Sequence, residues 1–232
     1  MEKILTVQVW SDVICPWCWI AEHRFQQALA KFAHRSQADV VHRAYRLKLG
    51  EARHPVEEML MKKFGPRVNP LQFLSQMEGA AAQDGLDYHL AGTWVGDTTD
   101  AHRVVKLARK YGLQSSLLEI FYKGYLSEHE DLLDRGTLVR LAQTAGLEAS
   151  TLEALFAGDD FLAEVESDQR EAMQRRISGV PYFLFGEKTS LSGAQPENIL
   201  ASTLAHAWKT ESVLPEQSTD AQVCGLEGCT IP

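Results

Sequence analysis

The spacing of hydrophobic and polar positions changes along the chain and divides it into regions. Apolar and polar residues alternate over residues 5–9, and this period of two predicts a strand. The run over residues 39–49, rich in β-branched and apolar residues, predicts a second strand. Between them, Pro16 suits a first helical turn, and apolar residues at helical spacing continue to residue 33. The first 50 residues therefore predict a strand–helix–strand unit.

The middle of the chain has a helical pattern almost throughout. From about residue 53 to residue 176, Gly, Pro and Asp separate segments with apolar residues at helical spacing. The clearest helices are predicted over 56–64, 69–83, 99–112, 116–126 and 130–146. No internal repeat is present.

The last part returns to strand character. Residues 179–195 predict two strands, with Gly186 and Glu187 as the turn between them, and residues 196–208 predict a final helix. From about Thr210 the sequence is polar and contains glycines, which is typical of a loosely held tail.

Composition and charge narrow the function classes. The chain has 232 residues, of which 45% are hydrophobic, enough to fill a core. Its net charge of -8 argues against nucleic acid or an anionic membrane as partner. No stretch is long enough to span a bilayer, and the start lacks the apolar region of a secretory signal. We therefore expect a cytoplasmic protein, in which a CxxC motif is more often catalytic or metal-binding than a permanent disulfide.

The four cysteines form two close pairs, Cys15 with Cys18 and Cys224 with Cys229. At a helix start, unpaired N–H groups and the helix dipole favour the thiolate, so Cys15 is the predicted nucleophile. Cys18 follows three residues later on the same side and is the predicted resolving thiol. A structural zinc site of four cysteines is the main alternative, but the two spacings differ and the second pair lies in the predicted tail. We therefore expect redox chemistry and no metal.

The second pair, in "CGLEGC", has two interpretations. Its spacing, with Gly225 and Gly228 freeing the backbone, permits a disulfide across a compact turn. So small a loop gains little from chain entropy, which makes a purely stabilising role a poor explanation. Cys224 and Cys229 are either a second redox pair that exchanges with the first or exposed thiols in a frayed terminus.

Four motifs in a fixed order resemble a known family. The segments "SDVICPWCWI", "TTDAHRVVKLA", "GVPYFLF" and "SGAQP" are similar to the FrnE-type branch of the DsbA-like thiol:disulfide oxidoreductases, in the thioredoxin superfamily. The resemblance covers residues 6–208. It implies an α/β thioredoxin fold, a mixed sheet with flanking helices, that carries a large all-helical insertion. The implied domains are 1–52 with 177–209, the insertion 53–176, and a tail over 210–232.

The resemblance also implies roles near the cysteines. Pro181 would be cis and lie against the CxxC motif, and Val180 would offer its backbone to an extended substrate. Without the resemblance, Pro181 would be interpreted as a proline at a strand start. Pro16 and Trp17, between the cysteines, are candidate substrate-binding residues, Trp17 as an apolar platform.

A histidine–arginine pair in the helical block is a further candidate. His102 and Arg103 match a family motif that faces the CxxC, and we take His102 as a candidate substrate-binding residue. Thr98, Thr99 or Asp100 could cap the helix that carries them. The alternative is an ordinary ion-paired helix face.

The predicted function is thiol:disulfide oxidoreduction or isomerisation on protein or peptide thiols and disulfides through Cys15 and Cys18. No bound cofactor is required, and a cellular thiol reductant or oxidant, with glutathione as a candidate, would recycle the pair. One alternative is a glutathione-dependent enzyme of the 2-hydroxychromene-2-carboxylate isomerase or kappa-class transferase type. Those relatives usually have serine in place of Cys15 and lack a resolving cysteine. A redox- or zinc-regulated holdase is the non-enzymatic alternative.

Overall fold

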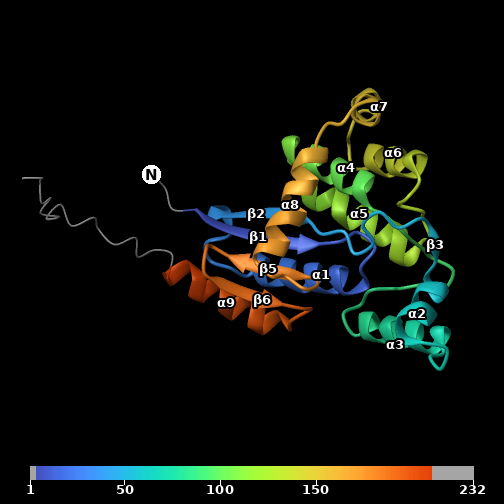
Figure 1. The fold of residues 1–232 in the computed structure, drawn as a ribbon. Helices are drawn as coiled ribbons and strands as arrows, with labels where there is room; N and C mark the ends of the chain where they lie inside the picture. Colours follow the sequence, from blue (N-terminus) through green and yellow to red (C-terminus); the bar gives the residue numbers. More distant parts are fainter. Residues whose placement is uncertain (1–3, 211–232) are drawn as a thin grey trace, which may run out of the picture.

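A four-stranded mixed sheet lies at the centre of the computed structural model, which describes residues 4–210 (Figure 1). Its order is β2-β1-β5-β6. Strand β1 pairs in parallel with β2 and antiparallel with β5, and β5 pairs antiparallel with β6. The strands are β1 (Leu5–Ser11), β2 (Ala38–Ala44), β5 (Tyr182–Phe185) and β6 (Thr189–Ser192).

Helices α1 (Pro16–Ala30) and α9 (Glu197–Thr210) cover one face of the sheet (Figure 1). The alternating residues predicted for the first strand explain this packing, because Leu5, Val7 and Val9 all point into the same apolar core. Aromatic residues of β5 and apolar residues of the two helices complete that core: Phe25, Phe183, Phe185, Leu200 and Leu204.

Helix α8 (Leu162–Gln174) packs on the opposite face, against β2 (Figure 1). The fully buried Trp10 lies there with Ala172, and its indole Nε1–H donates to the Asp168 carbonyl at 3.2 Å. The Asp168 carboxylate accepts the Ala44 N–H at 2.8 Å and pairs with Arg43 at 2.9 Å. These contacts join the last helix of the insertion to the sheet.

The insertion packs against the start of α1 through a second core. Its helices before α8 are α2 (Val56–Phe64), α3 (Pro70–Ala82), α4 (Thr99–Lys110), α5 (Gln114–Ser127), α6 (Arg135–Thr144) and α7 (Ala149–Ala157). Cys18, Trp19 and Ile20 of α1 are part of the same buried cluster as Leu117 and Phe121 of α5. The N-terminal end of α1 is therefore packed against the insertion.

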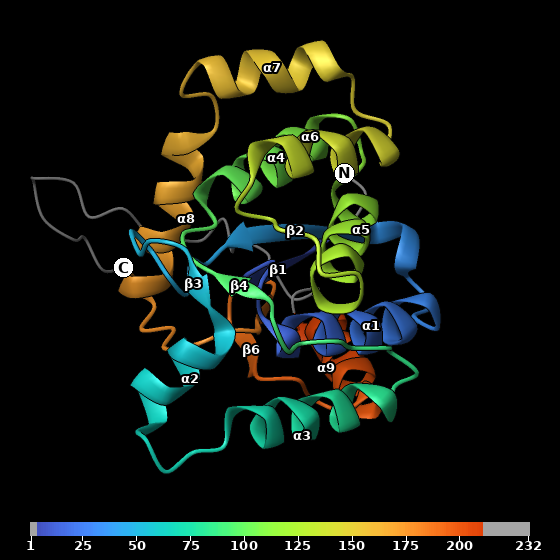
Figure 2. The same cartoon turned by 90° about the vertical axis from the view of Figure 1, so that its right-hand side faces the viewer.

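The expectation of an all-helical insertion is wrong in one detail. Strands β3 (His54–Pro55) and β4 (Trp94–Val95) pair antiparallel beside α2 (Figure 2). Two residues are too few to produce an alternating pattern, and Pro55 argues against a strand in the sequence. This small ladder closes the loop that carries α2 and α3.

Several predicted boundaries are corrected. The second strand ends at Ala44 rather than at residue 49, because the chain turns away and the Leu47 N–H bonds the Asp12 carboxylate at 2.8 Å. The first helix ends at Ala30 rather than at residue 33. The final helix continues to Thr210, a residue that the sequence pattern places in the tail. None of the helices within residues 4–210 is long and apolar enough to cross a membrane.

Candidate active site at the Cys15–Cys18 pair

The CPWC motif lies at the carboxyl end of β1, where α1 begins (Figure 1). Cys15 is the N-cap residue with an extended backbone, and Pro16 is the first helical residue, as predicted. The Cys15 N–H donates to the Asp12 carbonyl at 3.1 Å, and the Cys18 N–H donates to the Cys15 carbonyl at 3.0 Å. Both cysteines are free thiols.

Both cysteines are buried, but only one of them lines a surface groove. Cys15 is 4% exposed and lines the groove, whereas Cys18 is 2% exposed and is not part of its lining. Burial raises the pKa of the Cys18 thiol well above its ordinary value, and a hydrogen bond and charge interaction with Cys15 raise that pKa further. Cys18 is therefore held as a thiol beside the sulfur that lines the groove.

The segment that precedes β5 faces Cys15. The Val180–Pro181 peptide bond is cis, as the family resemblance implies. The Cys15 thiol lies 3.9 Å from the Val180 carbonyl oxygen, in a position to donate to it. The structure thus places the Val180 carbonyl, although 165 residues away in sequence, against Cys15, and the cis-proline follows directly after it.

A groove of about 390 Å³ opens beside Cys15. Pro16, Trp17 and Val180 line its near side, and Trp17 is 43% exposed. The far side comes from α2 and α3, which lie beyond the end of the sheet where α1 begins (Figure 1). Its apolar residues there are Met59, Leu60, Phe64, Phe73, Leu74 and Met77. The groove is therefore largely apolar and has the Cys15 sulfur in its wall.

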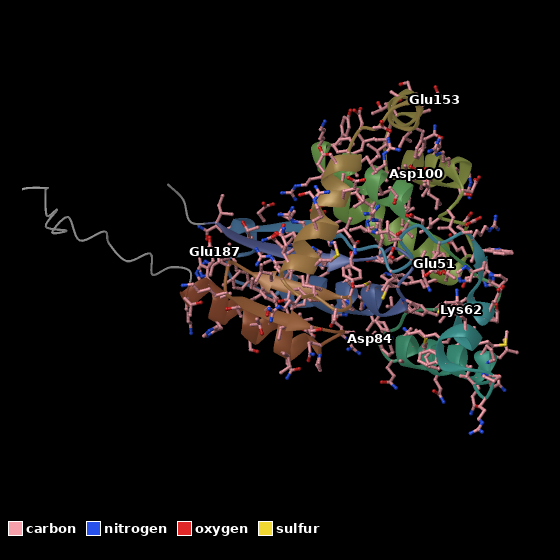
Figure 3. The ribbon with its side chains drawn as sticks, viewed as in Figure 1. Glu51, Lys62, Asp84, Asp100, Glu153 and Glu187 are labelled. Atoms are coloured by element: carbon pink, nitrogen blue, oxygen red, sulfur yellow. The ribbon has the colours of Figure 1, made fainter. Side chains whose placement is uncertain are left out.

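Two lysines give the groove its positive charge, and an ion pair holds one of its helices in place. Its charged lining residues are Lys48 and Lys63. Lys48 pairs with Glu51 at 3.2 Å, and Glu51 lies at the same end of the molecule as Lys62 (Figure 3). Asp84, just after α3, accepts hydrogen bonds of 2.8 and 2.7 Å from Arg24 of α1. That pair fixes the end of α3 against the helix that carries the cysteines.

His102 lies beside Asp12, three residues before Cys15, and is absent from the described lining of the groove. Its Nε2 is 3.4 Å from the Asp12 Oδ1, and the two residues are 3% and 0% exposed. Thr98 is the N-cap residue of α4, one of the three predicted candidates, but its side chain makes no capping bond, and the Asp97 carboxylate accepts the Thr99 N–H at 2.9 Å instead. The histidine therefore faces the CPWC loop but not the groove.

Sequence reasoning missed several contacts of the site. The Tyr88 hydroxyl donates to the Pro16 carbonyl at 2.7 Å, and its ring stacks on Trp19 with centroids 5.3 Å apart. Burial raises the pKa of Tyr88 far above its ordinary value, so it remains a donor. Tyr88 carries no motif signal. Asp12 stands inside the quoted "SDVICPWC", and its spacing of three before Cys15 was the available clue.

Other regions offer less for chemistry. A cavity of about 480 Å³ is lined by Arg43, Lys106 and Arg109, away from the cysteines. Those cations already pair with Asp168 or Asp39. Residues 4–210 hold no cluster of three His, Cys, Asp or Glu side chains that could bind a metal ion. Cys224 and Cys229 lie outside the described residues.

The parallel β1–β2 crossover, the β5–β6 hairpin, the CxxC at a helix start and the facing cis-proline define a thioredoxin-fold protein with a dithiol pair. The model of the DSBA-like thioredoxin domain matches residues 6–205, and the chain belongs to this family. A probable DsbA oxidoreductase from Streptomyces coelicolor has a similar structure, with 37% identity, a TM-score of 0.84 and coverage of 98% of this chain and 99% of that one. No curated protein matches this sequence.

More distant structures share the fold. The cytosolic disulfide reductase DsbM from Pseudomonas aeruginosa, solved with glutathione, is 15% identical with a TM-score of 0.59, and 89% of this chain and 98% of that one are covered. A 2-hydroxychromene-2-carboxylate isomerase is 12% identical with a TM-score of 0.65, at the same coverage of both chains. At such identities the likeness extends to the fold alone.

Proposed function

We propose that this protein catalyses thiol:disulfide exchange on protein or peptide substrates, with Cys15 as nucleophile and Cys18 as resolving thiol. The observation that carries the proposal is the asymmetry of the pair: Cys15 lines the groove, and Cys18 is buried behind it with a raised pKa. Such an arrangement lets a substrate disulfide reach one sulfur only. The order of the four motifs further supports assignment to the FrnE-type branch.

The reaction exchanges one disulfide for another. The Cys15 thiolate attacks a substrate sulfur, forms a mixed disulfide and expels the first substrate thiolate. Cys18 then loses its proton and attacks the Cys15 sulfur, which expels the second substrate thiolate. Two electrons have moved, so the substrate disulfide is reduced and a Cys15–Cys18 disulfide is formed. The same steps in reverse oxidise a substrate dithiol, and attack on the mixed disulfide by another thiol of the substrate releases Cys15 and leaves the substrate isomerised. A cellular thiol reductant or oxidant resets the pair after reduction or oxidation.

The groove supports an extended polypeptide segment as substrate. Its apolar wall suits bulky side chains that flank a cysteine, and Trp17 offers an exposed aromatic face at the entrance. Pro16 and Val180 line the groove beside the sulfur under attack, where a bound chain would pass, and Pro181 follows Val180 through the cis peptide bond. Lys48 and Lys63 add positive charge within a protein of net charge -8. The proposed setting is the cytoplasm, with neither nucleic acid nor membrane as partner.

Two other functions use fewer of these features. A glutathione-dependent isomerase or transferase needs no second thiol behind the first, so Cys18 weighs against it, although glutathione remains a candidate exchange partner. A zinc-regulated holdase would need Cys224 and Cys229, whose alternative role is a second redox pair. Metal analysis of the reduced protein and a glutathione-conjugation assay separate these from oxidoreduction.

Serine variants test the two roles. In reduction of a model protein disulfide driven by a dithiol, Cys15→Ser should abolish turnover, because no accessible sulfur remains. Cys18→Ser should accumulate mixed disulfides with the substrate, seen as a thiol-sensitive mass increase on a non-reducing gel. Full activity of Cys15→Ser would exclude the mechanism.

A further inference from the structure

The helix that carries the cysteines begins without the usual support of a helix start. Cys15 is its N-cap residue and makes no capping bond through its side chain, and no acidic residue follows in the first turn. Helix ends fray, because their first N–H groups have no partner within the helix. Under the proposed function the Cys15 sulfur must stay free to attack a substrate, so it cannot serve as a cap. The first turn of α1 therefore has to be held by another part of the protein.

A tyrosine of the insertion contacts that turn. The Tyr88 hydroxyl donates to the Pro16 carbonyl at 2.7 Å. Burial is the largest cause of the raised pKa of Tyr88, whereas a hydrogen bond with the Ile20 backbone lowers this pKa, as a donating N–H group does. One hydroxyl thus binds the carbonyl of Pro16 and the N–H of Ile20, which stand four residues apart as the partners of an α-helical bond do.

The ring of Tyr88 makes a second contact with the same turn. It stacks on Trp19, with centroids 5.3 Å apart and planes 8° from parallel. Trp19 is itself fixed, because its indole Nε1–H donates to the Glu119 carboxylate at 2.9 Å. Such aromatic pairs contribute more than the area that they bury. Since Trp19 directly follows Cys18, the stack holds α1 beside the resolving thiol.

The segment that carries Tyr88 is fixed next to the tyrosine. The His89 N–H donates to the Leu126 carbonyl of α5 at 2.6 Å, and the Leu90 N–H donates to the Glu78 carboxylate of α3 at 2.8 Å. Tyr88 itself is 4% exposed. The tyrosine therefore reaches α1 from a well-held position in the insertion, which is what an anchor for a helix start requires.

We propose that Tyr88 is a positioning residue for the exchange reaction: it replaces the cap that Cys15 cannot provide and holds the first turn of α1 so that Cys18 faces the Cys15 sulfur. This inference rests on the proposed function. In the resolving step Cys18 gives its proton to solvent and a Cys15–Cys18 bond forms. The bond from Cys15 to the substrate sulfur breaks, and the departing sulfur keeps its electron pair. Tyr88 keeps its own proton throughout, and its effect is on how closely the two sulfurs are held for attack.

The test separates attack from resolution in the full chain. Reduced protein is mixed with oxidised glutathione, quenched with acid at intervals and digested with pepsin, and mass spectrometry follows the peptide that contains Cys15 and Cys18. Glutathione on this peptide reports attack, and its replacement by the internal disulfide reports resolution. Peptide mapping keeps these species apart from any reaction at Cys224 and Cys229.

The variant Tyr88→Phe keeps the ring and removes the hydroxyl. Resolution should slow by about three- to tenfold, as expected for the loss of one hydrogen-bonding group, while attack stays within about twofold of the native rate. Tyr122→Phe is the matched control, because Tyr122 also stacks on Trp19, at 6.5 Å, but its hydroxyl bonds Ser11 of β1. A role limited to stability would lower the Tm of the variant and leave the ratio of resolution to attack unchanged.

The outcomes distinguish this inference from the proposed function. An unchanged ratio of resolution to attack in Tyr88→Phe, or an equal fall of this ratio in Tyr122→Phe, would overturn the role of Tyr88. If the native protein formed neither the mixed disulfide nor the Cys15–Cys18 disulfide, the proposed function would fail instead.

Hydrogen exchange provides a measurement on the native protein in case the variant does not fold. The Ile20 N–H should be strongly protected, and in Tyr88→Phe this protection should fall by about three- to tenfold while the Phe25 amide, further along α1, keeps its own. Rapid exchange of the Ile20 amide in the native protein would contradict the anchoring of this turn.

Discussion

Arg103 follows His102 in the segment "TTDAHRVVKLA", which resembles a family motif. Its substitution tests whether this part of the motif has a structural role. Arg103 is 4% exposed and holds the segment between α7 and α8 through its whole guanidinium group. It donates to the carbonyls of Asp160 at 2.9 Å, Leu155 at 2.6 Å and Gly158 at 2.5 Å, and to the Asp100 carboxylate at 2.9 Å. The ion-paired helix interpretation therefore describes Arg103, even though His102 faces the active site.

The substitution Arg103→Met keeps the length of the aliphatic stem and removes every donor. It leaves three carbonyls without their charged donor and a carboxylate without its buried partner. Removal of one member of a buried ionic network costs about 3–5 kcal/mol, a large share of a typical stability of about 5–15 kcal/mol. For a chain of this size, about 2–4 °C per kcal/mol gives a fall in Tm of about 6–20 °C.

The assay is thermal and urea unfolding of the reduced protein, with Arg135→Met as the matched control. Arg135 also binds Asp100, at 2.6 Å, but its side chain is 56% exposed, so its loss should cost less than about 1 kcal/mol. Figure 3 shows Asp100 among the helices of the insertion. The reasoning is refuted if Arg103→Met stays within 1 kcal/mol of the native protein, or if both variants destabilise it equally.

Two further predictions concern charge. Burial, more than the Arg109 and Lys106 charges, lowers the pKa of His42 below its ordinary 6.5, so the folded protein binds this proton less readily than the unfolded chain. Stability should therefore fall as pH drops below about 6.5, by up to about 1.4 kcal/mol per pH unit, and urea titrations of His42→Gln should show a flatter dependence. At the groove, Lys63→Glu should lower kcat/KM several-fold for a peptide disulfide flanked by glutamates but not for one flanked by lysines, and added salt should weaken the effect. Lys62→Glu, on the same helix but outside the groove lining, is its control, and equal effects of the two variants would remove the assigned role of Lys63.

The elements with strong periodic signals could be predicted from sequence. The alternation in β1 and the proline of α1 predicted where these elements begin, although β1 continues to Ser11 and α1 ends three residues early, at Ala30, and the helical spacing of α2 predicted both of its ends. The β3–β4 ladder could not be predicted, because a two-residue strand carries no period and its partner lies some 40 positions away in sequence. The early end of β2 depends on a hydrogen bond between the Leu47 N–H and Asp12, which no local pattern encodes.

The residues of the candidate site also divide into those that the sequence predicts and those that it does not. Cys15, Cys18 and Pro181 were predicted because a short motif or a family resemblance carries their chemistry. The residues of the groove wall could not be predicted, because Leu60 and Phe73 have the same spacing as any core-facing residues. Only the packing of α2 and α3 makes them line the groove. Tertiary contact, not sequence pattern, decides which apolar helix face stays open to a substrate.

The inserted helices also form part of the surroundings of the CPWC motif. Cys18 and Trp19 belong to the thioredoxin-like part by sequence, yet their side chains are buried in the core of the inserted helices. Tyr88 bonds the Pro16 carbonyl from the insertion side. Because burial is the largest cause of the raised pKa of Cys18, the helices that bury this side chain contribute to holding it as a thiol. A thioredoxin fold without this insertion would keep the CPWC turn but lose part of the core that buries Cys18, so the environment of this cysteine is a property of both parts together.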